Sequence, residues 1–313
     1  MNLFKRTTLT VALLIIMLSS ALVYAKITHT LLVIDSESQQ EFPGRFRTTS
    51  DALPVDTTYS KEGLENVRAA GSQQFSTNGL RAVLAKLPSK SVIVVDLRRE
   101  SHGHMNDSAV SWFGPQNAAN ETKTPDQIKQ SESRLLARLK KSRFKWIYRI
   151  IEKSDDGYIE KVSKEFMHVT SVKSEQQLAE EFHAGYKRFY VEDFHAPDDA
   201  TIARFVNLVK HLPQDTWLYF HCRAGRGRTT TFMTMYDMMR NAKTVSFEDI
   251  MNRQMALGGS NLQELPEENH YKYKYALQRL NFLKNFYEYI KTNNDDFSTT
   301  WLQWKRNIPV KSS

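Results

Sequence analysis

The stretch HCRAGRGRTT at residues 221–230 holds Cys222, the only cysteine among the 313 residues of the chain. A single thiol has no disulfide partner within its own chain, so Cys222 is either a small buried side chain or a reactive nucleophile. Five residues separate it from Arg228, enough for the backbone to curl around an anion with its N–H groups inward. Gly225 and Gly227 permit the close backbone approach and positive φ that such a curl needs. This spacing favours a phosphate cradle with a nucleophile inside it.

The charges around this loop favour the reactive interpretation of Cys222. A helix that starts near Arg228 directs its positive end toward the loop, and Arg228 itself offers a planar fork for two phosphate oxygens. The combined field favours thiolate over thiol, and Thr229 can donate a hydrogen bond to the sulfur. We therefore expect Cys222, Arg228 and Thr229 to be catalytic. The residues expected to bind phosphate are Arg223, Ala224, Gly225, Arg226, Gly227 and Arg228.

Strands and helices alternate along the segments that must position this loop. The apolar run at 217–220 predicts a strand that leads straight into Cys222, and a helix is expected from about 228 to 241. The β-branched run at 91–97 is typical of a strand buried on both faces. The other predicted elements are a strand at 186–191 and helical segments at 61–88 (with a break at SQQFS, 72–76), 174–184, 198–212 and 246–292. This rhythm predicts an α/β fold.

Residues from about 104 to 172 differ in character from the rest of the chain. Asn- and Lys-rich loops surround a helix expected around 126–141. Two strand-like runs follow at 145–152 and 158–169, separated by the turn sequence KSDDG. We interpret this stretch as a small β-rich insertion in the α/β domain.

Residues 1–25 have the plan of a secretory signal peptide. A basic pair at 5–6 precedes an apolar run at about 9–23, and small residues stand at the expected cleavage positions. We expect a mature domain of 26–313 that is secreted or periplasmic, without stable membrane association after cleavage. A retained membrane anchor is the alternative, although the run is short for a span of ~20 residues.

The composition is that of a globular protein with a surplus of positive charge. The formal net charge of +8 suits an anionic ligand. The chain has no run of five Lys or Arg and no zinc-ligand spacing. Nucleic acid is therefore not expected as a partner.

The loop resembles the His-Cys-x5-Arg-Ser/Thr signature of the protein tyrosine phosphatase superfamily. The resemblance implies that the cysteine attacks phosphorus, that a cysteinyl-phosphate forms, and that an aspartate serves as acid and then base, without metal or cofactor. The segment YVEDFHAP at 190–197 resembles the mobile acid loop of that superfamily, and it places Asp193 29 residues before Cys222. We expect Asp193 to be the acid. Glu192 and His195 are its local competitors, and an ordinary capping aspartate is the alternative.

Further segments resemble one branch of the superfamily, the tyrosine-phosphatase-like inositol polyphosphatases or cysteine phytases. They are RFRT at 45–48, DLRRESHG at 96–103, AVSWFG at 109–114, GRTTTFMTMYDM at 227–238 and NRQMALGG at 252–259. The resemblance spans roughly 30–305 and implies a phosphatase-like α/β core with a small, partial β-barrel insertion. It also implies stepwise hydrolysis of inositol hexakisphosphate by exported bacterial enzymes.

The substrate that this resemblance implies is densely anionic and needs cations around the loop. Arg223 and Arg226 supply two, and Lys272 matches a lysine that contacts substrate in the family. Lys274 is the fallback for Lys272, and solvated helix-face lysines are the alternative for both. Family members can carry a histidine directly after the acid, where this chain has its histidine one place later, at His195. His195 is therefore also expected to contact substrate.

Four polar residues of the DLRRESHG segment admit two interpretations. They could shape the wall of the pocket, or they could form buried polar ties at the end of a strand. We favour the second interpretation, in which these residues form buried hydrogen bonds and ion pairs with one another or with their neighbours, because buried charges need partners. The residues are Asp96, Arg98, Glu100 and His102.

These observations together predict an exported phosphomonoesterase that acts on inositol polyphosphates through Cys222. A protein tyrosine, dual-specificity or phosphoinositide phosphatase is the first alternative. A non-catalytic protein that binds inositol phosphates is the second. The presence of Cys222, Arg228 and Asp193 argues against this second alternative.

Overall fold

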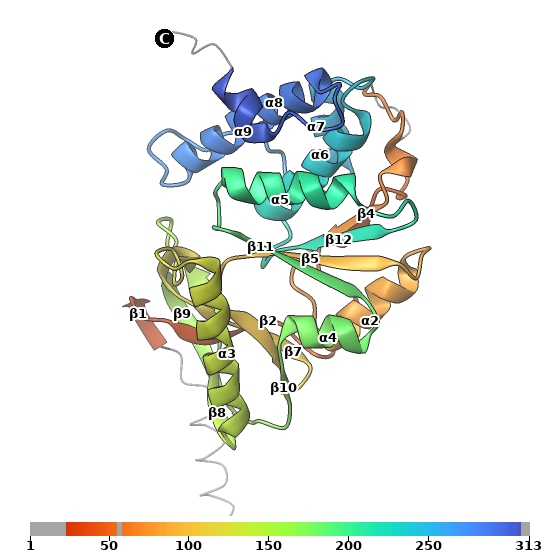
Figure 1. Ribbon diagram of the computed structural model, residues 1–313. Coiled ribbons are helices and arrows are strands. Elements are labelled where there is room, and N and C mark those ends of the chain that lie inside the picture. Colours follow the sequence, from red (N-terminus) through yellow and green to blue (C-terminus); the bar gives the residue numbers. More distant parts are fainter. Residues whose placement is uncertain (1–22, 55–57, 308–313) are drawn as a thin grey trace, which may run out of the picture. The chain divides into compact units, whose positions relative to one another are not determined.

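The computed structural model describes residues 23–54 and 58–307, and it divides the chain into two compact units. The core unit comprises residues 39–99 and 176–313, and the β-rich unit comprises the residues up to 38 together with 100–175. Both contain strands and helices, as the predicted fold class requires (Figure 1). The predicted signal peptide at 1–25 lies almost wholly outside the described residues and stays a prediction.

The core unit contains a five-stranded sheet with the order β11-β5-β12-β4-β3. Its strands are parallel, except that β3 runs antiparallel to β4. The three strands predicted in this region are confirmed to within one residue at each end, as β5, β11 and β12. The bounds are β3 Arg47–Thr48, β4 Ala69–Ser72, β5 Val92–Arg98, β11 Gly185–Val191 and β12 Trp217–His221.

Helices cover both faces of this sheet (Figure 1). On one face, α2 (Thr77–Lys86) and α4 (Glu175–Glu181) bury Leu80 and Leu178 against Val94 and Tyr219 of the strands. A larger apolar cluster on the other face joins strand residues to five further helices. These are α5 Asp199–Lys210, α6 Gly227–Asn241, α7 Phe247–Ala256, α8 Tyr273–Thr292 and α9 Trp301–Arg306. Burial of apolar surface on both faces explains the continuous apolar run at 92–95, in the first half of β5.

The prediction of a helix over 61–88 is wrong in its first half. That stretch contains a short 3-10 helix, η1 (Leu64–Asn66), then β4, and only then α2. The β4 sequence AAGS carries no β-branched residue and therefore gives no strand signal. Its small side chains are required by packing, because a Cβ on Gly71 would lie 2.4 Å from the Met233 Sδ of α6.

α6 runs through the middle of the core unit and is buried on nearly all sides, with Phe232, Met233 and Met235 fully enclosed. One buried carboxylate fixes it to the next helix. Asp237 of α6 accepts hydrogen bonds from Arg253 Nε at 2.8 Å and Gln254 Nε2 at 2.9 Å, both on α7. A buried charge bound by several donors is costly to disturb, so this network holds the helix that begins at the phosphate loop.

The β-rich unit contains a seven-stranded sheet with the order β1-β9-β8-β2-β7-β6-β10 and the helix α3 (Pro125–Lys141). The predicted insertion at about 104–172 falls inside this unit, which also includes β1 and β2 because β2 pairs with β7. β1 and β10 are edge strands among the described residues, so a barrel here is at most partial. The bounds are β1 Val23–Ile27, β2 Leu31–Ser36, β6 His102–Met105, β7 Ser108–Phe113, β8 Phe144–Lys153, β9 Ile159–His168 and β10 Val172–Lys173. Within 23–54 and 58–307, no helix combines the length and apolar character of a membrane span.

Candidate active site

Four parallel strands of the core unit end at the same edge of its sheet. Their last residues are Ser72 of β4, Arg98 of β5, Val191 of β11 and His221 of β12. The loop that follows β12 returns as α6 at Gly227. Loops at the carboxyl edge of a parallel sheet are where ligands of open α/β folds bind, so residues 222–227 are the natural centre of a site. We call them the phosphate loop.

Cys222 is the first residue of the phosphate loop and is 2% exposed. The hydroxyl of Thr229, in the first turn of α6, donates a hydrogen bond to its sulfur at 3.2 Å. A sulfur at the amino end of a helix lies where the helix field favours negative charge. The structure therefore places the predicted nucleophile and its predicted hydrogen-bond donor together.

Two glycines allow the backbone of the phosphate loop to turn tightly and to pack closely against its surroundings. Gly225 has φ +67°, and a Cβ there would lie 2.3 Å from the backbone nitrogen of Gln73. A Cβ on Gly227 would lie 2.8 Å from Nη1 of Arg279. Only a residue without a side chain fits at Gly225, because the obstacle is backbone that cannot rotate away.

Arg228 is almost fully buried behind the loop. Its Nη1 donates to the backbone oxygen of Val191 at 3.2 Å, and its Nη2 lies 3.2 Å from Oδ1 of Asp193. The guanidinium is thus anchored to the end of β11 and paired with the predicted acid. A planar fork held in this way can receive two oxygens of an anion.

Asp193 lies on the loop between β11 and α5 and points to Arg228, whereas its competitor Glu192 lies 3.3 Å from Arg99. The backbone N–H of Phe194 donates to Oδ1 of Asp193 at 3.1 Å. Phe194 itself has φ +69°, a strained value for a bulky residue, as is found at functional loops. Nδ1 of His195 lies 2.8 Å from the backbone oxygen of Asp193. These contacts distinguish Asp193 from both of its neighbours.

The two predicted lysines differ in their surroundings. Lys272 precedes α8, and its Nζ lies 4.8 Å from the centre of the Phe194 ring. Burial lowers the pKa of Lys272, Asp193 acts to raise it, and Arg226 lowers it further. Lys272 therefore lies beside both the acid and the phosphate loop. Lys274 is exposed, with its Nζ 4.7 Å from the centre of the Tyr275 ring, and no contact among the described residues joins it to the loop.

Arg279 was missed by the sequence reasoning. It lies on α8, seven residues after Lys272, and its Nη1 donates to the backbone oxygen of Phe194 at 3.3 Å. Burial lowers the pKa of Arg279, while Asp193 and Cys222 both act to raise it. Seven residues are two helical turns, so the spacing of the two cations on one helix face was the available signal.

Arg47, in the RFRT segment, is a second cation whose contacts the sequence did not reveal. It is 2% exposed on β3, and its Nη1 donates to the backbone oxygen of Gly225 at 3.1 Å. Its Nη2 donates to Oγ1 of Thr230 at 3.1 Å. Burial lowers the pKa of Arg47 to about 10, Cys222 acts to raise it, and Arg45 lowers it.

The acidic and basic residues at the end of β5 form buried ties, the interpretation favoured from the sequence. Asp96 accepts a hydrogen bond from the Tyr186 hydroxyl at 2.8 Å and forms an ion pair with Arg188, whose Nε lies 2.9 Å from its Oδ2. Arg98 donates to Oε1 of Gln74 at 2.6 Å. In the β-rich unit, Glu100 and His102 are equally buried, and Nδ1 of His102 lies 2.9 Å from the backbone oxygen of Glu100.

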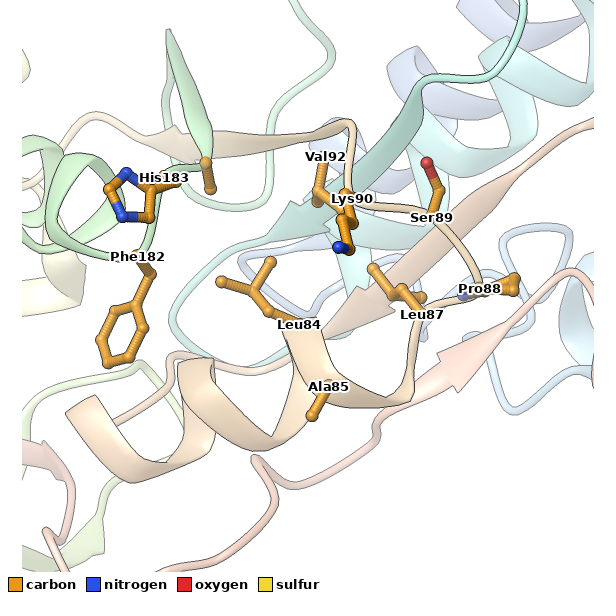
Figure 2. A pocket seen from close by; sticks show the side chains of 10 residues that line it. Leu84, Ala85, Leu87, Pro88, Ser89, Lys90, Val92, Phe182 and His183 are labelled. Atoms are coloured by element: carbon orange, nitrogen blue, oxygen red, sulfur yellow. The ribbon is translucent and has the colours of Figure 1, made fainter.

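A cavity of about 610 Å3 lies at the opposite, amino-terminal end of the core sheet. Figure 2 shows its lining, which comes from the end of α2, the loop before β5, and the segment after α4. The lining is mainly apolar, with Leu84, Leu87 and Phe182 among its members. Its polar members are Ser89, Lys90 and His183, and its lining contains no carboxylate, so its size alone does not make it a reaction site.

The chain is similar to proteins whose names point to one chemistry. A family model for PTP-like phytases, described by the words inositol hexakisphosphate, matches residues 95–240. The PTP-like phytase from Bdellovibrio bacteriovorus is 32% identical with a TM-score of 0.70, covering 90% of this chain and 96% of that one. The PTP-like myo-inositol phosphatase from Mitsuokella multacida, solved in complex with myo-inositol-(1,3,4,5)-tetrakisphosphate, is 35% identical with a TM-score of 0.85. That match covers 93% of this chain and 50% of the Mitsuokella chain.

A curated relative is the effector protein hopD2 of Pseudomonas syringae pv. tomato, 29% identical over 274 residues. The match covers 85% of this chain and 57% of the effector. The chain thus spans about half the length of two of these relatives. The similarity to the solved structures confirms the predicted α/β fold class.

Proposed function

Because this chain belongs to the PTP-like phytase family, we propose that it is a phosphatase that hydrolyses inositol polyphosphates, inositol hexakisphosphate among them, through a cysteinyl-phosphate. The observation that carries the proposal is the meeting of three groups at one sheet edge. Cys222 lies at the start of the phosphate loop, Arg228 is anchored beside it, and Asp193 is paired with Arg228 at 3.2 Å. Transfer of a phosphoryl group to a thiolate needs these three groups: a nucleophile, a cation that binds the phosphoryl oxygens, and an acid for the leaving group.

In the first step the Cys222 thiolate attacks phosphorus, so that an S–P bond forms while the bond from phosphorus to the inositol oxygen breaks. Asp193 in its protonated form gives its proton to the departing oxygen. The N–H groups of the phosphate loop and the Arg228 fork stabilise the negative charge on the phosphoryl oxygens. Thr229 donates to the sulfur.

In the second step water attacks the phosphorus of the cysteinyl-phosphate and the S–P bond breaks. Asp193, now a carboxylate, takes the proton from the attacking water. Inorganic phosphate leaves and Cys222 is again a thiolate, which the Thr229 hydrogen bond helps to stabilise as a leaving group. Repetition on other positions of the same ring gives stepwise hydrolysis.

The choice of substrate rests on the cations around the phosphate loop. Arg226 is exposed on the loop, Arg223 is half-buried there, and Lys272 and Arg279 reach the acid loop from α8. A ring that carries several phosphates can contact all of these cations at once. A substrate with a single phosphate contacts only the phosphate loop and Arg228. The solved complex of the Mitsuokella relative with an inositol tetrakisphosphate supports this class of substrate.

Phosphate release from inositol hexakisphosphate and from a phosphotyrosyl peptide, measured side by side with chelator present, tests the assignment. We expect the higher kcat/KM on the inositol substrate, because only that substrate engages the surrounding cations. A higher kcat/KM on the peptide would move the function to protein dephosphorylation. Tight binding of inositol hexakisphosphate without turnover would identify a binding protein instead.

The salt dependence of KM provides a separate test of the surrounding cations. We expect KM for inositol hexakisphosphate to rise several-fold between roughly 0.05 and 0.5 M salt, because screening weakens the attraction of exposed charges. Arg226→Gln should flatten this rise. Lys90→Gln, which changes an exposed cation beside the cavity of Figure 2, should leave it unchanged. A KM independent of salt in the unmodified protein would remove the role given to these cations.

A further inference from the structure

Two backbone oxygens of the phosphate loop are hydrogen-bonded to the protein that surrounds it. The oxygen of Arg223 accepts from the backbone N–H of Gln74 at 3.2 Å, and the oxygen of Gly225 accepts from Arg47 Nη1 at 3.1 Å. The C=O and the following N–H of a trans peptide point in opposite directions, and the described residues contain no cis peptide. The N–H groups of Ala224 and Arg226 are therefore directed away from these partners, toward the inner side of the loop.

The orientation of the peptide between Gly225 and Arg226 depends on a hydrogen bond from outside the loop. Gly225 has φ +67° and no side chain, so its neighbouring peptides can rotate more freely than those of other residues. Within the part of the chain that the structure describes, the hydrogen bond from Arg47 is the one recorded to the oxygen of Gly225. A reversed peptide would present this oxygen to the phosphate and withdraw an N–H from it.

Arg47 is itself held firmly enough to impose this direction. Its Nη1 also donates to the backbone oxygen of Arg45 at 3.1 Å, and its Nη2 donates to Oγ1 of Thr230 at 3.1 Å. The same Thr230 oxygen accepts from the backbone N–H of Ser260 at 3.0 Å. A buried guanidinium with three acceptors has little freedom to move.

We propose that Arg47 is a positioning residue that holds the Gly225–Arg226 peptide with its N–H toward the bound phosphate. The role of this N–H in catalysis rests on the proposed function, but its role in binding an oxyanion does not. Arg47 acts through the backbone of the loop, unlike Arg228, which we expect to contact the anion directly. Its loss should therefore weaken binding of any phosphate-like oxyanion, whatever the attached organic group.

The affinity for orthovanadate, measured by calorimetry on the full chain, tests this role without turnover. Arg47→Lys keeps the charge but loses the fork that reaches several acceptors at once. We expect its vanadate affinity to fall about ten- to a hundred-fold, the loss typical of a charge-assisted hydrogen bond. KM and kcat for p-nitrophenyl phosphate should change with it, so that kcat/KM falls by a comparable factor. Arg47→Gln, which keeps one uncharged donor nitrogen in place of the guanidinium, should show a loss at least as large.

Arg45→Gln is the matched control, because Arg45 is exposed, lies two residues away and also contributes positive charge near Arg47. We expect its vanadate affinity to stay within about threefold of the unmodified protein, as for a surface charge. Far-UV circular dichroism and the melting temperature establish that each variant is folded. A folded Arg47→Lys or Arg47→Gln protein that binds vanadate as tightly as Arg45→Gln would overturn the proposal. If the unmodified chain hydrolyses no phosphomonoester yet loses vanadate affinity in both variants, the proposed function fails and the role of Arg47 stands.

Discussion

Replacing Cys222 by serine is expected to lower kcat on inositol hexakisphosphate by on the order of 10⁴-fold or more, the scale of losing a catalytic nucleophile. A serine hydroxyl is not ionised near neutral pH and is a far weaker nucleophile than the thiolate of a cysteine. The measurement is phosphate release in the steady state. Because the side chain is 2% exposed and the substitution is nearly isosteric, the variant should fold and still bind vanadate or substrate.

The single cysteine provides a control that needs no substitution. Iodoacetate can alkylate only one thiol per chain, so the fraction of chains labelled should equal the fraction of activity lost. Inorganic phosphate should protect against both, since it occupies the same loop. A Cys222→Ser protein that keeps more than about a tenth of the activity would contradict a nucleophilic role, because it would have lost far less than the removal of such a group costs.

Replacing Asp193 by asparagine is expected to lower kcat on inositol hexakisphosphate about 10²- to 10⁴-fold, the usual contribution of general acid–base catalysis. The amide keeps the size and the contacts of the carboxyl group at the Phe194 N–H, but it can neither give nor take the proton. With p-nitrophenyl phosphate, the leaving group departs without a proton. Formation of the cysteinyl-phosphate should therefore stay fast in this variant, while its hydrolysis, which needs the base, should be slow. Rapid mixing should therefore show a burst of p-nitrophenolate close to one per chain.

Glu192→Gln is the matched control for Asp193→Asn. The two carboxylates are adjacent in the sequence, but Glu192 lies 3.3 Å from Arg99 and 3.7 Å from Nε2 of His195. We expect Glu192→Gln to retain activity within a few-fold of the unmodified protein, as for a partly exposed ion pair. The reverse ranking of the two variants would assign the acid to Glu192.

The phosphate loop was predictable from the sequence because its chemistry is local. Cys222, Gly225 and Arg228 lie within one strand–loop–helix segment, so backbone geometry and spacing alone bring them near one another. The core strands β5 and β12 were predictable for a similar reason, since burial on both faces favours runs of apolar residues. The short strand β4 was not predictable, because its residues are small and have low strand propensity. They are small because α6 packs closely against β4.

By itself, the sequence determined the nucleophile loop, the alternation of strands and helices that frames it, and the motifs of the family. Only the tertiary structure decided which distant side chains serve that loop. Arg47 lies 178 residues before Gly225 along the chain, and Arg279 lies 85 residues after Phe194, yet each donates to a backbone oxygen of the site. Contacts of this kind arise where β3 and α8 pack beside the loop. No local pattern of residue types predicts these contacts, because the path of the whole chain decides which distant residues meet.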